Sequence, residues 1–212
     1  MLTEKRVDEF INEVASASPA PGGGSVSALV GALGAGLTSM VCHLTIGRKK
    51  YASVGEQMAS VLRRAEDIRR ELTSLVEQDT QAFTGVMAAY ALPKRTEEEK
   101  ARRTDAIQQE MRQATLVPLR VMELCVDGLS LAKVVTESGN SNSISDAGVG
   151  ALLLHAASLG AHLNVRINLS VMNDKTFVTK TGGTAAELFR RADRLRNEIM
   201  KSVESAFEPQ QS

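Results

Sequence analysis

An aspartate lies on what should be the buried face of a long helix. The stripe of apolar residues that contains Leu72 and Val76 recurs with helical spacing and continues onto Asp79. A carboxylate withdrawn from water needs a cation, hydrogen-bond donors or a ligand in place of its hydration, and functional pKa shifts arise at such positions. Asp79 is therefore a candidate catalytic residue that would supply a fixed negative charge or a base. The alternatives are a structural pair with a buried Arg or Lys, and local exposure at a helix bend.

A glycine-rich segment leads directly into a predicted helix start. The residues that follow one another there are Pro21, Gly22, Gly23, Gly24 and Ser25. Free amide groups at a helix N-terminus, together with the helix dipole, attract an anion or a partial negative charge, so this segment is a candidate for substrate binding. A tight connection before a capping serine is the alternative. The GxxxxGK[ST] pattern is absent, so a nucleoside triphosphate is not predicted.

Amide and hydroxyl groups cluster at 139–146, before another predicted helix. Asn140 and Asn142 are candidates for reading the hydrogen-bonding edge of a polar heterocycle, and Asp146 is a second candidate catalytic residue. Asn also favours turns, and Ser143 with Asp146 matches a capping box. A purely structural loop is therefore the alternative.

Further charged and amide side chains stand near or within apolar segments. Arg48 and Lys49 follow a predicted helix, where cations are stabilised by the helix C-terminus; the same two residues would also suit the carboxylates of an acidic substrate tail. Asn164, Arg166 and Asn168 lie inside an apolar stretch and require partners that the sequence does not name.

The elements that must position these groups are helices, because apolar residues follow the helical period along most of the chain. We expect a first helix that follows Thr3 and ends before 18–24, helices over 25–46 and 55–90, a helix from 97 that is kinked by Pro118, a shorter helix ending at Gly139, a helix over 147–163 and a final helix after 184. The start signals are Thr3 as an N-cap and the capping boxes Thr96 with Glu99, Ser143 with Asp146, and Thr184 with Glu187.

The predicted fold class is all-α, a compact bundle of long helices around a buried Gly- and Ala-rich helix over 25–46. This helix is apolar on nearly every side, so it belongs at the centre of the subunit or in a dimer interface. Residues 25–47 carry no Asp, Glu, Lys or Arg and would be long enough to cross a bilayer, but Gly, Ser and Thr dilute their Leu and Val content, which favours a buried helix. Residues 163–171 alternate as in a strand; because a lone strand would lack a partner, we expect a helical continuation or an irregular segment.

Composition limits the functional classes. The chain has 212 residues, of which 43% are hydrophobic, so we expect one domain over 1–207 and a short polar tail over 208–212. The 25 Lys and Arg residues balance 25 Asp and Glu residues, which argues against nucleic acid and membranes as partners. Cys42 and Cys125 lie in apolar settings and no signal peptide is visible, so a cytoplasmic location is expected. The 3 histidines show no metal-ligand spacing, so no metal site is predicted.

Several segments together resemble one family, the cyclodeaminase domain of formiminotransferase-cyclodeaminase and the free-standing bacterial methenyltetrahydrofolate cyclohydrolases related to it. The matching segments are PAPGGGSVSALVGALGAGLTSMV at 19–41, LTIGRKKY at 44–51, DTQAF at 79–83, ALPKRTEEEKARR at 91–103, GNSNSISDAGVGALLLHAA at 139–157 and GAHLNVRINL at 160–169. They cover nearly the whole chain. The PAPGGGS opening, the GN-N-SD loop and NVRINL, in this order and spacing, make the likeness specific.

The resemblance implies an all-α homodimer that acts on a tetrahydrofolate derivative and keeps no permanently bound cofactor. Because 212 residues leave no room for a transferase domain, hydrolysis of 5,10-methenyltetrahydrofolate to 10-formyltetrahydrofolate is the expected reaction. One alternative is a formiminotetrahydrofolate cyclodeaminase that releases ammonia. Another is a helical dimer that binds folate without turning it over.

The resemblance also suggests what each candidate residue would do. Asp79 would place negative charge, and a base, near the one-carbon unit. Asn140, Asn142 and Asp146 would orient the pterin or polarise the water. The amides of Gly22 to Ser25 would line the pocket. Arg48 and Lys49 would contact the glutamate tail.

Overall fold

The computed structural model describes residues 1–208, and every element in that range is helical. The α-helices are α1 (Val7–Val14), α2 (Gly23–Thr45), α3 (Gly55–Tyr90), α4 (Glu97–Ser138), α5 (Ile144–Leu169) and α6 (Lys175–Phe207). The 3-10 helices are η1 (Leu2–Glu4), η2 (Lys49–Val54) and η3 (Ser141–Ser143). The predicted all-α class is confirmed, while the predicted tail over 208–212 lies, beyond Glu208, outside the described residues.

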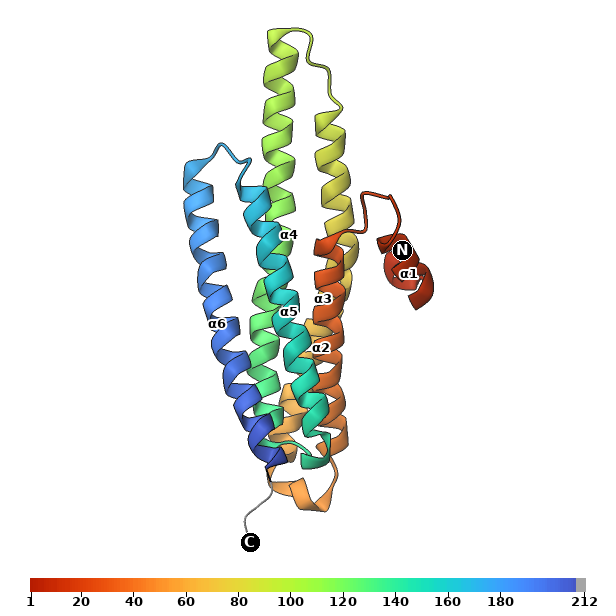
Figure 1. Ribbon diagram of the computed structural model, residues 1–212, viewed down its shortest axis with the longest axis vertical. Coiled ribbons are helices and arrows are strands. Elements are labelled where there is room, and N and C mark those ends of the chain that lie inside the picture. Colours follow the sequence, from red (N-terminus) through yellow and green to blue (C-terminus); the bar gives the residue numbers. More distant parts are fainter. Residues whose placement is uncertain (209–212) are drawn as a thin grey trace.

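Helices α2, α3, α4 and α5 form an antiparallel bundle, and α6 packs against α4 and α5 (Figure 1). Figure 1 also shows that the joined ends of α3 and α4 extend beyond the start of α2. The largest fully buried side chains include Met58, Leu72, Met122, Leu129, Leu154 and Ile199 from the other four helices, and α2 adds the smaller Val41. The core therefore runs along the bundle axis, with small residues on the α2 side.

Small residues let α2 and α5 approach each other closely. A Cβ added at Gly34 would lie 2.8 Å from the carbonyl oxygen of Gly150, so a side chain there would overlap the α5 backbone. The prediction of a Gly- and Ala-rich helix packed inside the bundle holds for most of α2, although Leu33 is 56% exposed. By length and composition, Gly23–Thr45 and Ser141–Leu169 would suit a membrane span, but much of both segments is buried inside the bundle, as in core helices.

Two predicted helix starts can be compared directly with the structure near α1 and α4. The capping box at α4 is confirmed, because the Glu99 backbone N–H donates to Thr96 Oγ1 at 3.1 Å and the Glu99 carboxylate accepts from the Thr96 backbone N–H at 3.2 Å. The Thr3 cap is wrong, because α1 begins at Val7 and its N-cap is Arg6.

The capping boxes predicted for α5 and α6 are also wrong. Helix α6 begins nine residues before Thr184, and its N-cap is Asp174, whose carboxylate accepts from the Phe177 backbone N–H at 2.9 Å. Thr184 instead lies inside the helix. At the start of α5, Ser143 is the N-cap, as the predicted helix start requires, but its side chain makes no capping hydrogen bond.

Pro118 does not divide its helix in two. Helix α4 runs through Pro118 as one element, so the prediction of a separate, shorter helix ending at Gly139 was wrong. Proline has no N–H for the carbonyl four residues earlier, which here belongs to Ala114. The side chain of Asn168 on α5 replaces that donor, because its Nδ2 donates to the Ala114 carbonyl oxygen at 2.8 Å.

The segment with strand-like alternation is helical. Helix α5 continues to Leu169, as expected from the lack of a partner strand. Val165 and Leu169 are buried, whereas Leu163 and Ile167 are 63% and 65% exposed. The alternation therefore comes from apolar residues on two different sides of one helix, one in the core and one at the surface.

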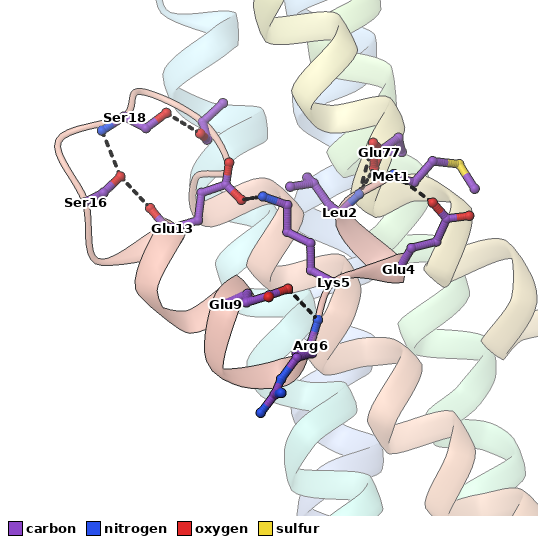
Figure 2. Close-up of polar contacts among 11 residues, drawn as sticks. Met1, Leu2, Glu4, Lys5, Arg6, Glu9, Glu13, Ser16, Ser18 and Glu77 are labelled. Carbon is purple, nitrogen blue, oxygen red and sulfur yellow. Dashed lines mark hydrogen bonds and ion pairs between the residues drawn. The ribbon is translucent and has the colours of Figure 1, made fainter.

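The N-terminal segment folds beside the bundle (Figure 2). The Leu2 backbone N–H donates to the Glu77 carboxylate at 2.8 Å, which ties η1 to α3. Lys5 pairs with Glu13 at the other end of α1. These contacts hold the loop that leads into α2, and that loop forms part of the site described next.

Candidate active site

A cavity of about 310 Å³ opens at the end of the bundle where α2 begins. Its wall combines the loop before α2, the first turn of α2, and side chains of α3, α4 and α5. Phe83 and Met111 make one part of the wall apolar, and Asp79, Asn164 and Asn168 bring polar groups. A concave, partly apolar site with a few converging polar groups is the usual form of a small-molecule pocket.

The Asp79 side chain is held by the first turn of α2. The buried hydroxyl of Ser25 lies 2.9 Å from Asp79 Oδ2 and 3.0 Å from the carbonyl oxygen of Val76. It also lies 3.2 Å from Thr80 Oγ1. These contacts join α2 to α3 at the cavity and fix one carboxylate oxygen of Asp79.

Burial raises the pKa of the Asp79 carboxyl above its ordinary value of 3.8, and hydrogen bonds from the Ser25 hydroxyl and backbone N–H oppose part of that rise. No cationic side chain among residues 1–208 contributes to the shift. Within these residues Asp79 therefore does not form the alternative, a structural ion pair with a buried Arg or Lys. A partly buried carboxylate without a cationic neighbour favours a positively charged ligand beside it.

Gly24 allows the close approach between α2 and Asp79. A Cβ added at Gly24 would lie 2.5 Å from Asp79 Cγ and 2.7 Å from Asp79 Oδ2, well inside van der Waals contact. Only a residue without a side chain fits unless the carboxylate moves. The predicted grouping of Gly22, Gly23 and Gly24 with Asp79 is thus found in one cavity wall, whereas Pro21 is buried and is not part of that wall.

Two wall residues had no assigned role in the sequence analysis. Asn164 Nδ2 donates to the Gly160 carbonyl oxygen at 2.9 Å, and Asn168 Nδ2 donates to that of Ala114 at 2.8 Å. The signal that identifies them is their spacing of four within an apolar helix, which places both carboxamides on one face.

Asn140 lies at the opposite end of α2 from the cavity and serves the loop there. Its Nδ2 donates to the Leu44 carbonyl oxygen at 3.0 Å, and its backbone N–H donates to Thr45 Oγ1 at 2.9 Å. Its side-chain oxygen accepts from the backbone N–H of Asn142 at 3.1 Å. The Asn140 side chain therefore satisfies backbone groups at the C-terminus of α2.

The other predicted site residues lie at this same far end. Arg48, Lys49 and Asn142 are exposed, and Asp146 is partly exposed in the first turn of α5. The length of α2 at 1.5 Å per residue places this end on the order of 30 Å from Asp79. One chain therefore brings Asp79 together with the glycine segment, and it does not bring Asn140, Asn142, Asp146, Arg48 or Lys49 to the same cavity.

Metal and thiol chemistry have little support in the described part of the chain. Within residues 1–208, no three His, Cys, Asp or Glu side chains gather in a way that could hold a metal ion. Burial raises the pKa of the Cys42 thiol to about 11 and also raises that of Cys125. Both thiols are therefore protonated at neutral pH and poor nucleophiles.

Comparison with known proteins identifies relatives along the whole chain. The family model described as formiminotransferase-cyclodeaminase matches residues 6–187. A methenyltetrahydrofolate cyclohydrolase from Methylorubrum extorquens is 42% identical over 205 residues, which cover 97% of this chain and 99% of that protein. The formimidoyltransferase-cyclodeaminase of Rattus norvegicus is 37% identical over 207 residues, 98% of this chain but only 38% of that longer protein.

The fold is also that of a solved relative. The crystal structure of a formiminotetrahydrofolate cyclodeaminase from Thermotoga maritima superposes with a TM-score of 0.87 at 30% sequence identity, over 97% of this chain and 98% of the other. The resemblance read from the PAPGGGS, GN-N-SD and NVRINL segments is thereby confirmed. The chain belongs to the formiminotransferase-cyclodeaminase family.

Proposed function

We propose that this protein hydrolyses 5,10-methenyltetrahydrofolate to 10-formyltetrahydrofolate in the cytoplasm, as a soluble homodimer. The observation that carries the proposal is the carboxylate of Asp79, partly buried at a cavity wall and with no cationic neighbour in the described part of the chain. Full-length similarity to a methenyltetrahydrofolate cyclohydrolase at 42% identity supports the choice of reaction.

The substrate explains why a carboxylate would be placed there. 5,10-Methenyltetrahydrofolate carries a positive charge shared between N5, the bridging carbon and N10. Water adds to that carbon and loses a proton. The tetrahedral adduct then breaks its bond to N5, which gains a proton as the hydroxyl group of the adduct loses one, and the formyl group stays on N10. Asp79 stabilises the cation by proximity and accepts the proton of the attacking water. Because no oxidation state changes, the proposal includes no permanently bound cofactor.

The second candidate function is formiminotetrahydrofolate cyclodeaminase. In that reaction N10 attacks the formimino carbon, ammonia leaves, and the same methenyl cation is the product. The solved relative from Thermotoga maritima, which shares the fold over 97% of this chain, favours this alternative. Asp79 would stabilise the methenyl cation both as the substrate of the cyclohydrolase and as the product of the cyclodeaminase.

Two assays on the purified protein separate the candidate functions. Loss of the methenyl chromophore faster than in a buffer control is expected for the cyclohydrolase, and ammonia release from formiminotetrahydrofolate is expected for the cyclodeaminase. Binding of tetrahydrofolate without either reaction would contradict both and leave a folate-binding dimer. The predicted outcome is chromophore loss that depends on enzyme concentration.

An apolar face on α2 and α5 supports the homodimer. The exposed large apolar residues on these two adjacent helices are Leu33, Val149, Leu152, Leu163 and Ile167, which are between 44% and 65% exposed. A groove beside them is lined by Leu29, Leu33 and Leu37 of α2. Large apolar side chains exposed on two adjacent helices favour an interface, and a second copy of the chain is the partner that a two-fold arrangement provides.

The dimer would give a role to the residues at the far end of α2. Arg48 and Lys49 are too far from Asp79 of the same chain to share one folate with it. A two-fold axis across the middle of the apolar face would place that end of one subunit beside the cavity of the other. In this arrangement the two cations meet the glutamate tail of the substrate, and Asn142 and Asp146 approach the same cavity.

Leu152→Glu tests this interface. A charge in the centre of the apolar face is expected to convert the dimer into a monomer and to lower turnover at least tenfold, because burying an unpaired carboxylate is costly. Light scattering after size-exclusion chromatography gives the mass. Leu116→Glu, at a position 40% exposed on α4, is the matched control and should stay dimeric and active. A wild-type protein that is monomeric at micromolar concentration would refute the dimer.

A further inference from the structure

Two asparagines present their side chains to the cavity from one face of α5. Asn164 and Asn168 are four residues apart, and both are partly buried. Asn164 lies against the first turn of α2, because a Cβ at Gly23 would be 3.6 Å from its Nδ2. Asn168 contacts α4 through the Ala114 carbonyl. The pair therefore spans the wall from α2 to α4.

Each carboxamide has a defined orientation. A backbone carbonyl only accepts hydrogen bonds, so the side-chain atom that contacts it must be the nitrogen, and the position of Oδ1 follows. Nδ2 of Asn164 is fixed by Gly160 and Nδ2 of Asn168 by Ala114. Within residues 1–208 neither Oδ1 has a hydrogen-bond partner in the protein. Both oxygen atoms are accessible to solvent. Two acceptor oxygens thus remain available to a ligand.

Pro118 determines the anchor of Asn168. Because proline cannot donate to the Ala114 carbonyl, that carbonyl is left for a donor from another element, and Asn168 supplies it. The Asn168 side chain is thereby held against α4 at the cavity. A helix without proline at this position would satisfy the Ala114 carbonyl internally and would hold the carboxamide less firmly.

We propose that Asn164 and Asn168 are specificity-determining residues, whose Oδ1 atoms bind the N–H groups of the bicyclic ring of the folate. This inference rests on the proposed function. The pyrimidinone ring of a reduced pterin is planar and carries ring N–H and amino donors along its edge, which suits two fixed acceptor oxygens. The apolar side chains of Phe83 and Met111 in the same cavity suit the faces of such a ring.

Asn168→Leu separates binding from chemistry. The change keeps the branching of the asparagine side chain at Cγ and removes the acceptor, so KM should rise about tenfold or more while kcat stays within about threefold. Asn164→Leu should have the same effect. Asn197→Leu, at an exposed position on α6, is the matched control and should leave KM unchanged. An unchanged KM in both cavity variants would overturn the proposal.

A double variant excludes a purely structural role. Asn168→Leu alone leaves the Ala114 carbonyl without its donor, and a resulting shift of α4 at the cavity would itself raise KM. Pro118→Ala adds a backbone N–H for that carbonyl, so the double variant Pro118→Ala with Asn168→Leu restores the hydrogen bond and still lacks the carboxamide. KM should remain raised about tenfold in the double variant. Recovery of the wild-type KM would show that Asn168 only repairs α4, and would refute the inference.

Binding of tetrahydrofolate, measured by calorimetry on the same variants, makes the test independent of turnover. The dissociation constant should rise in parallel with KM. If the wild-type protein binds tetrahydrofolate but turns over neither folate substrate, the proposed function fails, while the loss of affinity in the asparagine variants still supports their role. If turnover is normal and affinity is unaffected by both variants, only the inference about the asparagines fails.

Discussion

Replacing Asp79 by Asn is expected to lower kcat by about 10²- to 10⁴-fold, the usual range for a group that moves a proton in the transition state. The substitution keeps the size of the side chain and an oxygen that accepts from the Ser25 hydroxyl, so the cavity should keep its shape. It removes the negative charge that would stabilise the substrate cation. The measurement is the rate of methenyl chromophore loss at saturating substrate.

The same variant should be more stable than the wild type at neutral pH. Because burial raises the pKa of Asp79, the folded protein binds the proton more tightly than the unfolded chain does. Above the folded-state pKa, ionisation of Asp79 therefore lowers the free energy of unfolding by its full amount. As the pH falls below 3.8, Asp79 becomes protonated in both states and this destabilisation disappears. The melting temperature of Asp79→Asn should exceed that of the wild type at pH 7, and the difference should vanish at low pH.

A neighbouring carboxylate on the same helix provides the control. Glu77 binds the Leu2 backbone N–H and does not line the cavity. Glu77→Gln should leave kcat unchanged and should not raise the melting temperature. Turnover close to normal in Asp79→Asn would remove Asp79 from the mechanism. A lower melting temperature in that variant would mean that the carboxylate is stabilised by the fold.

The helical fold could be predicted because its signals are local. The periodicity over 55–90 and the capping box of Thr96 with Glu99 each depend on residues close in sequence, and the structure confirms both. The pattern of Thr184 with Glu187 wrongly predicted a helix start because it, too, is only a local signal. A Thr followed by Glu three residues later also occurs inside helices, where the Thr184 hydroxyl donates to the Lys180 carbonyl oxygen. The real signal was Asp174, ten residues earlier.

One half of the candidate site was visible in the sequence because it breaks local rules. Asp79 interrupts an apolar stripe, and Gly24 belongs to a run of glycines at a helix start. The role of Asn168 depends on a tertiary contact with the carbonyl that Pro118 leaves open. The sequence shows that Ala114 needs a donor, but it does not show which residue supplies it.

The sequence also predicts the distance between the two groups of candidate residues, one near the start of α2 and the other beyond its end. Ser25 lies in the first turn of α2 and Arg48 follows its last turn, so the 23 residues of this helix separate their surroundings by on the order of 30 Å. The sequence analysis grouped them through family likeness alone. A helix of this length allows both to serve one substrate only if they come from different subunits, which is why the oligomeric state bears directly on the mechanism.

Gly24→Ala is expected to lower kcat about 100-fold by displacing Asp79. The added methyl group would lie 2.5 Å from Asp79 Cγ, so the carboxylate must move by an ångström or more, and misplacement of that size typically costs about 10² in rate. Because alanine is the better helix former, unfolding of the variant should not become much easier. The measurement is kcat together with the melting temperature.

Two glycine-to-alanine controls show whether the effect is steric and local. Gly23 lines the same cavity, but among the described residues its added methyl group meets Asn164 Nδ2 at an ordinary 3.6 Å and does not approach Asp79, so kcat should fall far less than in the Gly24 variant. At Gly183 in α6 nothing lies within 4 Å, so activity should be unchanged and stability should rise by about 0.5–1 kcal/mol. Equal activity in the Gly24 and Gly23 variants would mean that the close approach of α2 to Asp79 has no part in catalysis. A large loss at Gly24 only would show that the position of the carboxylate, in addition to its charge, sets the rate.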